Sequence, residues 1–303
     1  MRALFLLISL FCSQGAYASD TGLSGFNIQH FHLAGDGSGV FSIEGSQLLK
    51  HHHNFLRLHS DVSGSLITSG NPATNRLVDL IDTLWSSEIS FSLGLFDIAN
   101  VGLQVPFYFY VGGNNESQRN FQTTSLGDVG FDGKIRLLEE SSKTPGVAFK
   151  ARLTAPTGEN SKFTGEGSPT FSLKVILDRH WDDLYVATNL GYQFIDRHFI
   201  QSGRTGAFWN VKNDDRLLFG MGTSYKLPWQ NKSWSVLGQL IGETVISHGS
   251  EVTTPIEFHL GCSKKFDHGL NLEAGAGRGL TNAIGSPAYR VFLGLSYDFS
   301  TLQ

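Results

Sequence analysis

Apolar and polar residues alternate with a period of two in twelve separate segments of this 303-residue chain. In residues 88–95, EISFSLGL, the side chains of Ile89, Phe91 and Leu93 fall on one face and mostly polar side chains fall on the other. That period is typical of a β-strand with one apolar face, since a helix repeats every 3.6 residues. The predicted strands are residues 53–62, 88–95, 101–110, 129–137, 147–154, 171–178, 184–194, 216–226, 234–246, 256–266, 270–276 and 289–299.

The links between these segments alternate between long and short. The long links are residues 63–84, 112–125, 158–169, 196–214, 247–255 and 281–287, and the short links are residues 97–100, 139–146, 179–183, 228–232 and 267–269. Long loops on one side and short turns on the other are typical of an up-and-down antiparallel barrel in an outer membrane. Both ends of the barrel are then expected on the short-turn, periplasmic side.

Alternation by itself does not say whether the apolar face meets a dry core or lipid. Charged residues occupy mid-strand positions on the polar face, and a water-filled lumen accommodates them. Twelve strands also enclose more space than side chains readily fill, and Trp85, Trp181 and Trp229 lie near strand ends, where membrane interfaces would be. A soluble β-sandwich explains neither the loop asymmetry nor the charged inner face. The predicted fold is an all-β, transmembrane, up-and-down antiparallel barrel of about 12 strands, surrounded by outer-membrane lipid.

The N-terminus has the pattern of a Sec-type signal peptide. Arg2 precedes an apolar run over residues 3–12, and Ala16, Tyr17 and Ala18 form an A-x-A cleavage site. The predicted division is a signal peptide over residues 1–18, an N-terminal periplasmic segment or plug over residues 19–52, and the barrel over residues 53–303. The expected location is the outer membrane of a Gram-negative bacterium.

Several classes of partner and cofactor are not expected. The formal charge of −4 provides no basic field for nucleic acid. The sequence shows no phosphate loop, Cys pair or cofactor fingerprint, so no cofactor is predicted. Histidines cluster before and inside the first strand, but adjacent strand residues point to opposite faces, which suits no tetrahedral metal site. These residues are His30, His32, His51, His52, His53 and His59.

Pro106 interrupts the third predicted strand. Proline has no N–H to donate to a sheet ladder, so it is unusual inside a strand. A local bulge at this position is the expected accommodation.

The last strand, FLGLSYDF, resembles the C-terminal assembly signal of outer-membrane barrels. Gly294, Leu295, Tyr297 and Phe299 occupy the glycine, hydrophobic and terminal aromatic positions of that signal. The resemblance implies recognition by the barrel-assembly machinery. Four residues follow Phe299 here, which departs from the usual terminal position of the aromatic residue.

A wider resemblance covers most of the chain after the signal peptide. The segments SLGLFDIANVGLQVPFYFY, LGDVGFDGKIRLL, GVAFKARLTAPTG, NLEAGAGRGLT and YRVFLGLSYDF resemble the barrel half of outer-membrane-protein-A-like proteins. They also resemble outer-membrane transporters of the aromatic-degradation type. The patterns consist of glycine, turn and apolar residues, so they imply a fold more than an activity. No peptidoglycan-binding domain is expected, since the sequence ends after the twelfth strand.

The charges on the polar face are the candidate site. Basic residues fall on the fourth, fifth and sixth strands (Lys134, Arg136, Lys150, Arg152, Lys174), and acidic residues fall on the ninth, tenth and eleventh strands (Glu243, Glu257, Glu273). Opposed walls of unlike charge would orient and select polar solutes in the lumen. Alternatively, these groups pair with one another and fill the interior.

Passive passage of small polar solutes through a monomeric channel is the predicted function, with the lumen charges setting selectivity. One alternative is a plugged structural or adhesive barrel that binds through the links 112–125 and 196–214. A less favoured alternative is an outer-membrane lipase or protease, for which His248 with Ser247 and Ser250, or His259 with Ser263, would be candidates. Neither group has a third residue at a telling spacing, so the protein is not expected to be an enzyme.

Overall fold

The computed structural model describes residues 26–71, 76–115, 119–196, 198–201, 210–247, 249 and 253–299. Nearly all regular structure in these residues is β-strand. The strands are β1 (Asn54–Asn71), β2 (Arg76–Leu95), β3 (Ala99–Asn115), β4 (Arg119–Leu126), β5 (Val129–Leu138), β6 (Gly146–Ala155), β7 (Thr170–Trp181), β8 (Leu184–Phe194), β9 (His198–Gln201), β10 (Asn210–Asn213), β11 (Arg216–Lys226), β12 (Trp234–Val245), β13 (Ile256–Lys265), β14 (Leu270–Gly279) and β15 (Tyr289–Asp298). Two short 3-10 turns, η1 (Asn160–Lys162) and η2 (Gln230–Lys232), complete the set. In the described residues, no helix is long and apolar enough to cross a membrane.

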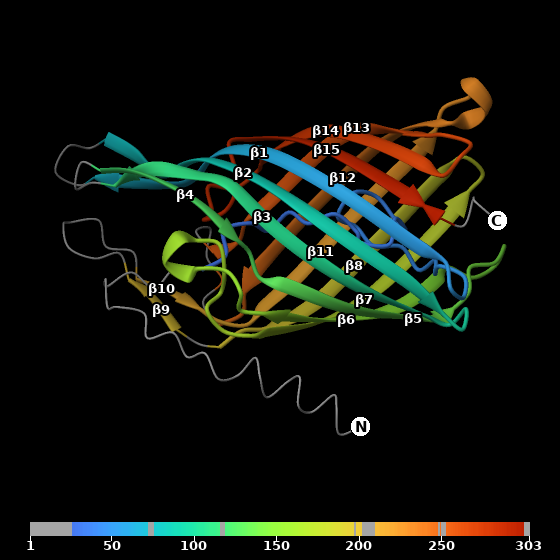
Figure 1. The fold of residues 1–303 in the computed structure, drawn as a ribbon, viewed down its shortest axis with the longest axis horizontal. Helices are drawn as coiled ribbons and strands as arrows, with labels where there is room; N and C mark the ends of the chain where they lie inside the picture. Colours follow the sequence, from blue (N-terminus) through green and yellow to red (C-terminus); the bar gives the residue numbers. More distant parts are fainter. Residues whose placement is uncertain are drawn as a thin grey trace.

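Twelve of the strands form a closed antiparallel ring (Figure 1). Around the ring the order is β1, β2, β3, β5, β6, β7, β8, β11, β12, β13, β14 and β15, and β15 pairs with β1 to close it. Successive ring strands are neighbours throughout, so the topology is up-and-down. The predicted fold class and strand count are confirmed. Of the three remaining strands, β4 pairs with β3 beside the ring, and β9 and β10 form a separate hairpin.

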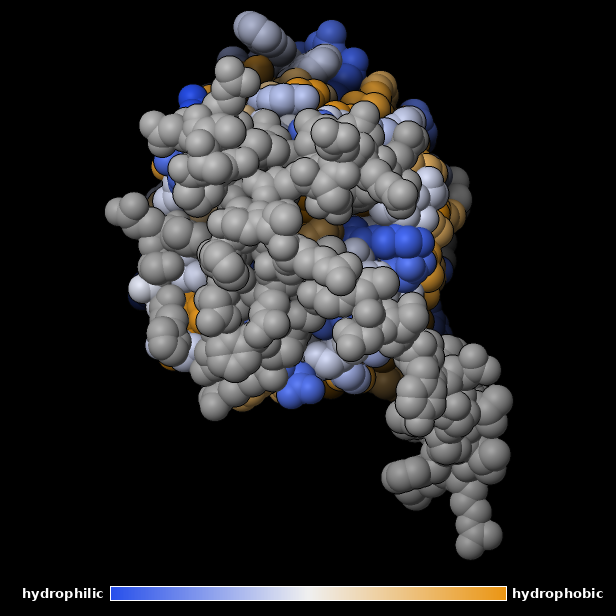
Figure 2. Space-filling view, turned by 90° about the vertical axis from the view of Figure 1, so that its left-hand side faces the viewer, coloured by the Kyte–Doolittle hydropathy of each residue, from blue (hydrophilic) through white to orange (hydrophobic). Residues whose placement is uncertain are grey.

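The apolar face of the wall points outward. On β1, Leu56 and Leu58 are 40% and 47% exposed, whereas Arg57 between them and His59 after them are buried. The same alternation repeats along the other ring strands, as at Phe131 and Val291. In Figure 2, which looks along the barrel from the long-loop end, hydrophobic residues show along the outer flanks. A closed ring with an apolar exterior is the architecture of an outer-membrane barrel, because no strand edge or polar face meets lipid.

Residues 26–53, called the inner segment below, run through the interior of the barrel (Figure 1). Side chains of the wall hydrogen-bond to the backbone of this segment, as the backbone of a neighbouring strand would do in a sheet. The N–H groups of Ser42, Glu44 and Ser46 donate to Gln239 on β12, Asn189 on β8 and Asp178 on β7, at 2.8–2.9 Å. These contacts satisfy backbone groups that would otherwise be buried without partners.

Two apolar clusters hold the inner segment against the wall. One cluster joins its start to β1, β2 and β3, and consists of Phe26, Ile28, Leu66, Ile81, Leu84, Tyr108, Val111 and Ile284. The other joins its middle to β8, β12 and β15, and consists of Phe31, Leu33, Val40, Phe41, Ile43, Tyr185, Ala187, Leu237 and Phe292. A side chain at Gly275 would collide with the Phe292 ring, so a glycine is required there for Phe292 to lie inside.

The predicted long links over residues 63–84 and 112–125 are wrong. β1 continues to Asn71 and β2 begins at Arg76, while β3 continues to Asn115 and β4 begins at Arg119. Backbone hydrogen bonds between neighbouring strands do not depend on an apolar face. The alternating pattern therefore ends where contact with lipid ends, although the strands continue.

The wall is interrupted beside Pro106, and the predicted bulge lies elsewhere. The β3–β5 ladder ends at Gln104, and the β3–β4 ladder starts at Phe107, so β4 and β5 form one broken strand. Between these ladders, Gly127 N donates to the Pro106 carbonyl at 2.9 Å. The bulge in the β2–β3 pair falls at Phe109, three residues further on. Because Pro106 cannot donate, the neighbouring strand breaks opposite it.

Candidate functional site

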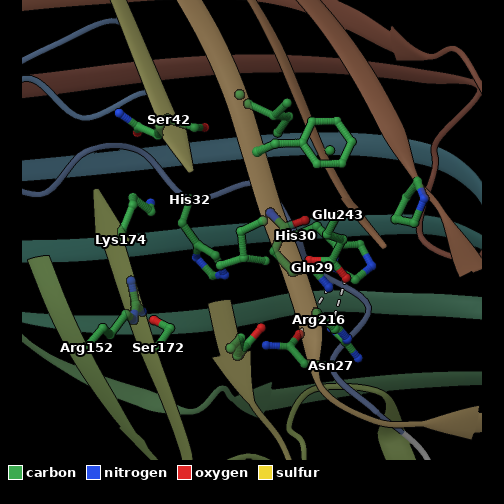
Figure 3. A pocket seen from close by; sticks show the side chains of 18 of the residues that line it. Asn27, Gln29, His30, His32, Ser42, Arg152, Ser172, Lys174, Arg216 and Glu243 are labelled. Carbon is green, nitrogen blue, oxygen red and sulfur yellow. Dashed lines mark hydrogen bonds and ion pairs between the residues drawn. The ribbon is translucent and has the colours of Figure 1, made fainter. Parts of the chain in front are cut away.

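A cavity of about 200 Å³ lies between the inner segment and one side of the wall. Its wall residues come mainly from β6, β7, β8, β11 and β12, and its inner residues come from 27–33 and 42–44. Figure 3 shows Arg152, Ser172 and Lys174 along one side of this space, with Glu243 and Arg216 on the other. This volume is below the roughly 300–1,000 Å³ of drug-sized ligand sites, so it suits a small solute.

Two rows of cross-strand neighbours run along this side of the wall, and all of their members except Lys150 and Gly191 line the cavity. The first row runs Arg152, Ser172, Gln193 and Arg216 across β6, β7, β8 and β11. The second row, two residues along each strand, runs Lys150, Lys174, Gly191, Leu218 and Glu243 and ends on β12. Residues two apart on a strand share a face, so both rows point into the lumen.

Four of the five predicted basic residues lie deep in the lumen. Lys134 pairs with Asp36 of the inner segment and donates to Ser38 Oγ at 2.8 Å. Lys150 lies 2.6 Å from Glu44 and 3.3 Å from Asp132. Arg152 contacts Gln104 and Asp132, and Lys174 faces the cavity. The fifth basic residue, Arg136, lies near the short-turn end beside Glu139.

The three predicted acidic residues also point inward, and each is paired with a basic residue. Glu243 lies 3.0 Å from Arg216 and 3.2 Å from His30. Glu257 binds Arg290, and Glu273 binds Arg57. The proposed role of the eight residues in selectivity stays a prediction.

The most buried ion-pair network was not predicted from the sequence. Arg290 on β15 is fully buried and donates to Asp61 on β1 at 2.5 Å, to both Glu257 oxygens at 3.0 and 3.2 Å, and to Gln29 of the inner segment at 2.9 Å. Arg290 alternates with apolar residues in YRVFLGL, so its inward position could be inferred. Its partners could not, because they come from three distant parts of the chain.

Electrostatic contacts favour the ionised form of Asp36 in the inner segment. Burial would raise the pKa of this carboxyl, but the adjacent Lys134 ammonium and the more distant Lys150 lower the pKa to about 2. Asn100 also donates to the Asp36 carboxylate at 2.8 Å. Asp36 is therefore a charged anchor of the inner segment at ordinary pH.

The histidines have separate contacts. His30 pairs with Glu243 and His32 pairs with Glu88, at 3.2 and 2.6 Å. His51 and His52 stack on each other near the short-turn end, with ring centroids 3.7 Å apart. Within the described ranges, no group of three or more His, Cys, Asp or Glu residues is placed to hold a metal ion.

The candidate catalytic pairs are only partly described. His248 and Ser250 lie outside the described residues. On β13, both ring nitrogens of His259 hydrogen-bond to residues other than Ser263: Nδ1 to Gln239 at 3.2 Å and Nε2 to Glu257 at 3.1 Å. His259 is therefore not oriented as a base for Ser263.

The remaining predicted positions lie at the two ends of the chain. The predicted signal peptide over residues 1–18 lies outside the described residues, so it stays a prediction. On β15, Leu295 is exposed on the outer face, Gly294 pairs with His59 of β1, and Phe299 follows the strand end. Tyr297 contacts the Phe299 ring at a centroid distance of 4.8 Å. The assembly role of these residues stays a prediction.

Comparisons with known proteins identify a family. No curated protein sequence matches the chain. Solved structures similar to it include the KdgM porin (11% identity, covering 81% of this chain and 99% of that one, TM-score 0.49) and the Pseudomonas putida toluene transporter TodX (11% identity, 91% and 98%, TM-score 0.44). The monoaromatic hydrocarbon channel CymD is also similar (9% identity, 82% and 88%, TM-score 0.43). The resemblance to outer-membrane-protein-A-like barrels stays a prediction. Residues 73–283 match the model of the family described as "Putative MetA-pathway of phenol degradation", and the chain belongs to this family.

Proposed function

We propose that this protein is an outer-membrane channel for the passive passage of small solutes, with lumen charges that set its selectivity. The cavity carries the proposal, because it lies inside a lipid-facing wall and is lined by charged and polar side chains. Charged groups lining a pore select solutes by sign and orientation. The family description supports aromatic compounds as the first solutes to test. We also propose export by the signal peptide, insertion by the assembly machinery and a monomeric state.

A plugged barrel with a structural or adhesive role is the second candidate. The burial of the inner segment favours it, since Ile28, Phe31 and Val40 are fully buried inside the ring. In this case the long loops would carry the binding, and no steady current would pass.

Single-channel recording in planar bilayers separates the two candidates. A channel gives stepwise currents, whereas a plugged barrel gives none. If the lumen charges set selectivity, changing Lys134, Lys150 and Lys174 together to Glu shifts the reversal potential in a salt gradient towards cation preference. The matched control is Lys143→Glu, in an exposed turn outside the lumen, which leaves the reversal potential unchanged. Currents whose ion preference is the same in the triple variant would contradict the selectivity role.

A further inference from the structure

Lys174 differs from every other charged residue that lines the cavity. Within the described part of the chain, its ammonium has neither a hydrogen-bond nor an ion-pair partner. The other charged lining residues all have partners: Glu44 with Lys150, Asp128 with the N–H groups of Gly158 and Glu166, Arg152 with Gln104 and Asp132, Arg216 with Glu166 and Glu243, and Glu257 with Arg290. A charge withdrawn from bulk water without a partner is unfavourable, so an anion at Lys174 would be stabilised.

The residues around Lys174 leave one positive charge unbalanced. Lys150 lies directly across from it on β6, and Arg152 lies two residues further along the same face. Among the described residues, two carboxylates lie within 4 Å of these three cations: Glu44 and Asp132 both contact Lys150, and Asp132 lies 3.9 Å from Arg152. Within this set of direct contacts the cations outnumber the carboxylates by one, which matches a monoanion.

Beside Lys174, the cavity becomes apolar. Gly191 on β8 separates Lys174 from Leu218 on β11, and a Cβ placed on this glycine would lie 3.5 Å from the Cβ atoms of both. Because Gly191 has no side chain, it places no side-chain atoms between Lys174 and Leu218 in this row. Apolar side chains line the cavity nearby: Leu218, Ile241, Leu33 and Ile43.

We propose that this part of the cavity, called the Lys174 site, binds a small monocarboxylate with a short apolar body. The carboxylate of the ligand contacts the Lys174 ammonium, and Ser172 of the adjacent row lines the same cavity. The apolar body of the ligand lies over Gly191 and packs against Leu218. A charge-assisted hydrogen bond gives the site its preference for an anion, and burial of methylene groups gives its preference for an apolar body. A role of the Lys174 site in transport rests on the proposed channel function, whereas binding of the monocarboxylate does not depend on that function.

Calorimetry on the purified full-length barrel in detergent tests the site with three probes. Hexanoate carries both the charge and the apolar body, hexanol lacks the charge, and acetate lacks the apolar body. We expect hexanoate to bind at least about ten-fold more tightly than either analogue. Equal affinity for hexanoate and hexanol would overturn the proposal.

Variants place the binding at Lys174. Lys174→Met should weaken hexanoate binding by about ten-fold or more, and Lys174→Arg should retain most of it. The matched control is Lys265→Met, which removes a lysine from the short-turn end of β13, outside the cavity lining. Undiminished hexanoate binding in a folded Lys174→Met barrel would overturn the proposal.

A second variant keeps the test informative if Lys174→Met does not fold. Leu218→Asn should remove the preference for hexanoate over acetate while leaving acetate binding unchanged. If Leu218→Asn keeps that preference, the apolar side of the site is wrong. Currents in planar bilayers are measured separately. Hexanoate binding without current would contradict the channel function and support the Lys174 site. Current without hexanoate binding would support the channel function and contradict the Lys174 site.

Discussion

The inner segment meets the two sides of the barrel wall in different ways. Towards β1, β13 and β15, it contributes Gln29 to a network in which Arg290 satisfies both Asp61 and Glu257. Towards β6, β7 and β8, it contributes Glu44, which neutralises Lys150, whereas Lys174 has no partner among the residues that the structure describes. One side is thus closed by paired charges, and the other retains a cavity and an uncompensated cation. Inward charges of the same sign therefore have opposite consequences, depending on whether a carboxylate of the wall or of the inner segment reaches them.

The largest expected effect on stability is on the side of β1, β13 and β15, where the buried charges are paired. Arg290→Met leaves the buried carboxylates of Asp61 and Glu257 without their cation, so we expect the free energy of unfolding to fall by about 3–5 kcal/mol. Urea titration of the barrel in detergent, followed by tryptophan fluorescence, measures this change. The control is Arg136→Met, because Arg136 pairs with the exposed Glu139 and its loss should cost less than about 1 kcal/mol. Equal losses of unfolding free energy in the two variants would contradict the expected difference between the buried Arg290 network and the exposed Arg136–Glu139 pair.

The paired side of the cavity wall should respond less strongly. Lys150→Met removes a cation shared by Glu44 and Asp132. We expect a loss of about 3 kcal/mol, because buried Glu44 then lacks its cation and Asp132 keeps only Arg152, at 3.9 Å. Lys174→Met, one strand away in the same row, should change the free energy of unfolding by no more than about 1 kcal/mol, or raise it. The same urea titration compares the two. A loss at Lys174 as large as that at Lys150 would show that Lys174 has a partner in the folded protein.

An effect smaller than the losses at Arg290 and Lys150 is expected from the pH dependence of stability at the inner segment. Because the pKa of Asp36 is lowered from 3.8 to about 2, its charge contributes stability above about pH 4, and this contribution is lost as the pH falls towards 2. We expect Asp36→Asn to be less stable than the native protein by about 2 kcal/mol at pH 5, with the difference shrinking between pH 4 and pH 2. Unfolding titrations at pH 5, 4, 3 and 2 measure it. A difference that stays constant over this range would contradict the Asp36–Lys134 anchor.

Sequence reasoning located the strands but not the ends of two hairpins or the break in the wall. The alternation at Leu56, Arg57, Leu58 and His59 predicted both faces of β1 correctly, because side-chain direction in a strand is a local property. The extension of β1 to Asn71 was missed, since strand pairing beyond the lipid requires no apolar face.

The candidate site was predicted only in outline. The eight charged positions were expected to face the lumen, and the inward positions of Lys134, Lys150 and Glu257 follow from period two. The position of Gly191 between Lys174 and Leu218 could not be inferred from the sequence, because it depends on the register of three neighbouring strands. Strand register is set by pairing between segments and is not visible in any one of them.

By itself, the sequence determined a wall: the number of its strands, the face that meets lipid and the charges that point inward. These follow from a two-residue period and from the cost of exposing strand edges to hydrocarbon. Only the tertiary structure decided which charges are neutralised. Asp36 reaches Lys134 and Gln29 reaches Arg290 because closure of the ring brings the inner segment against both. Such contacts join residues far apart in the chain, and their energies depend on distance and burial, which no local pattern encodes.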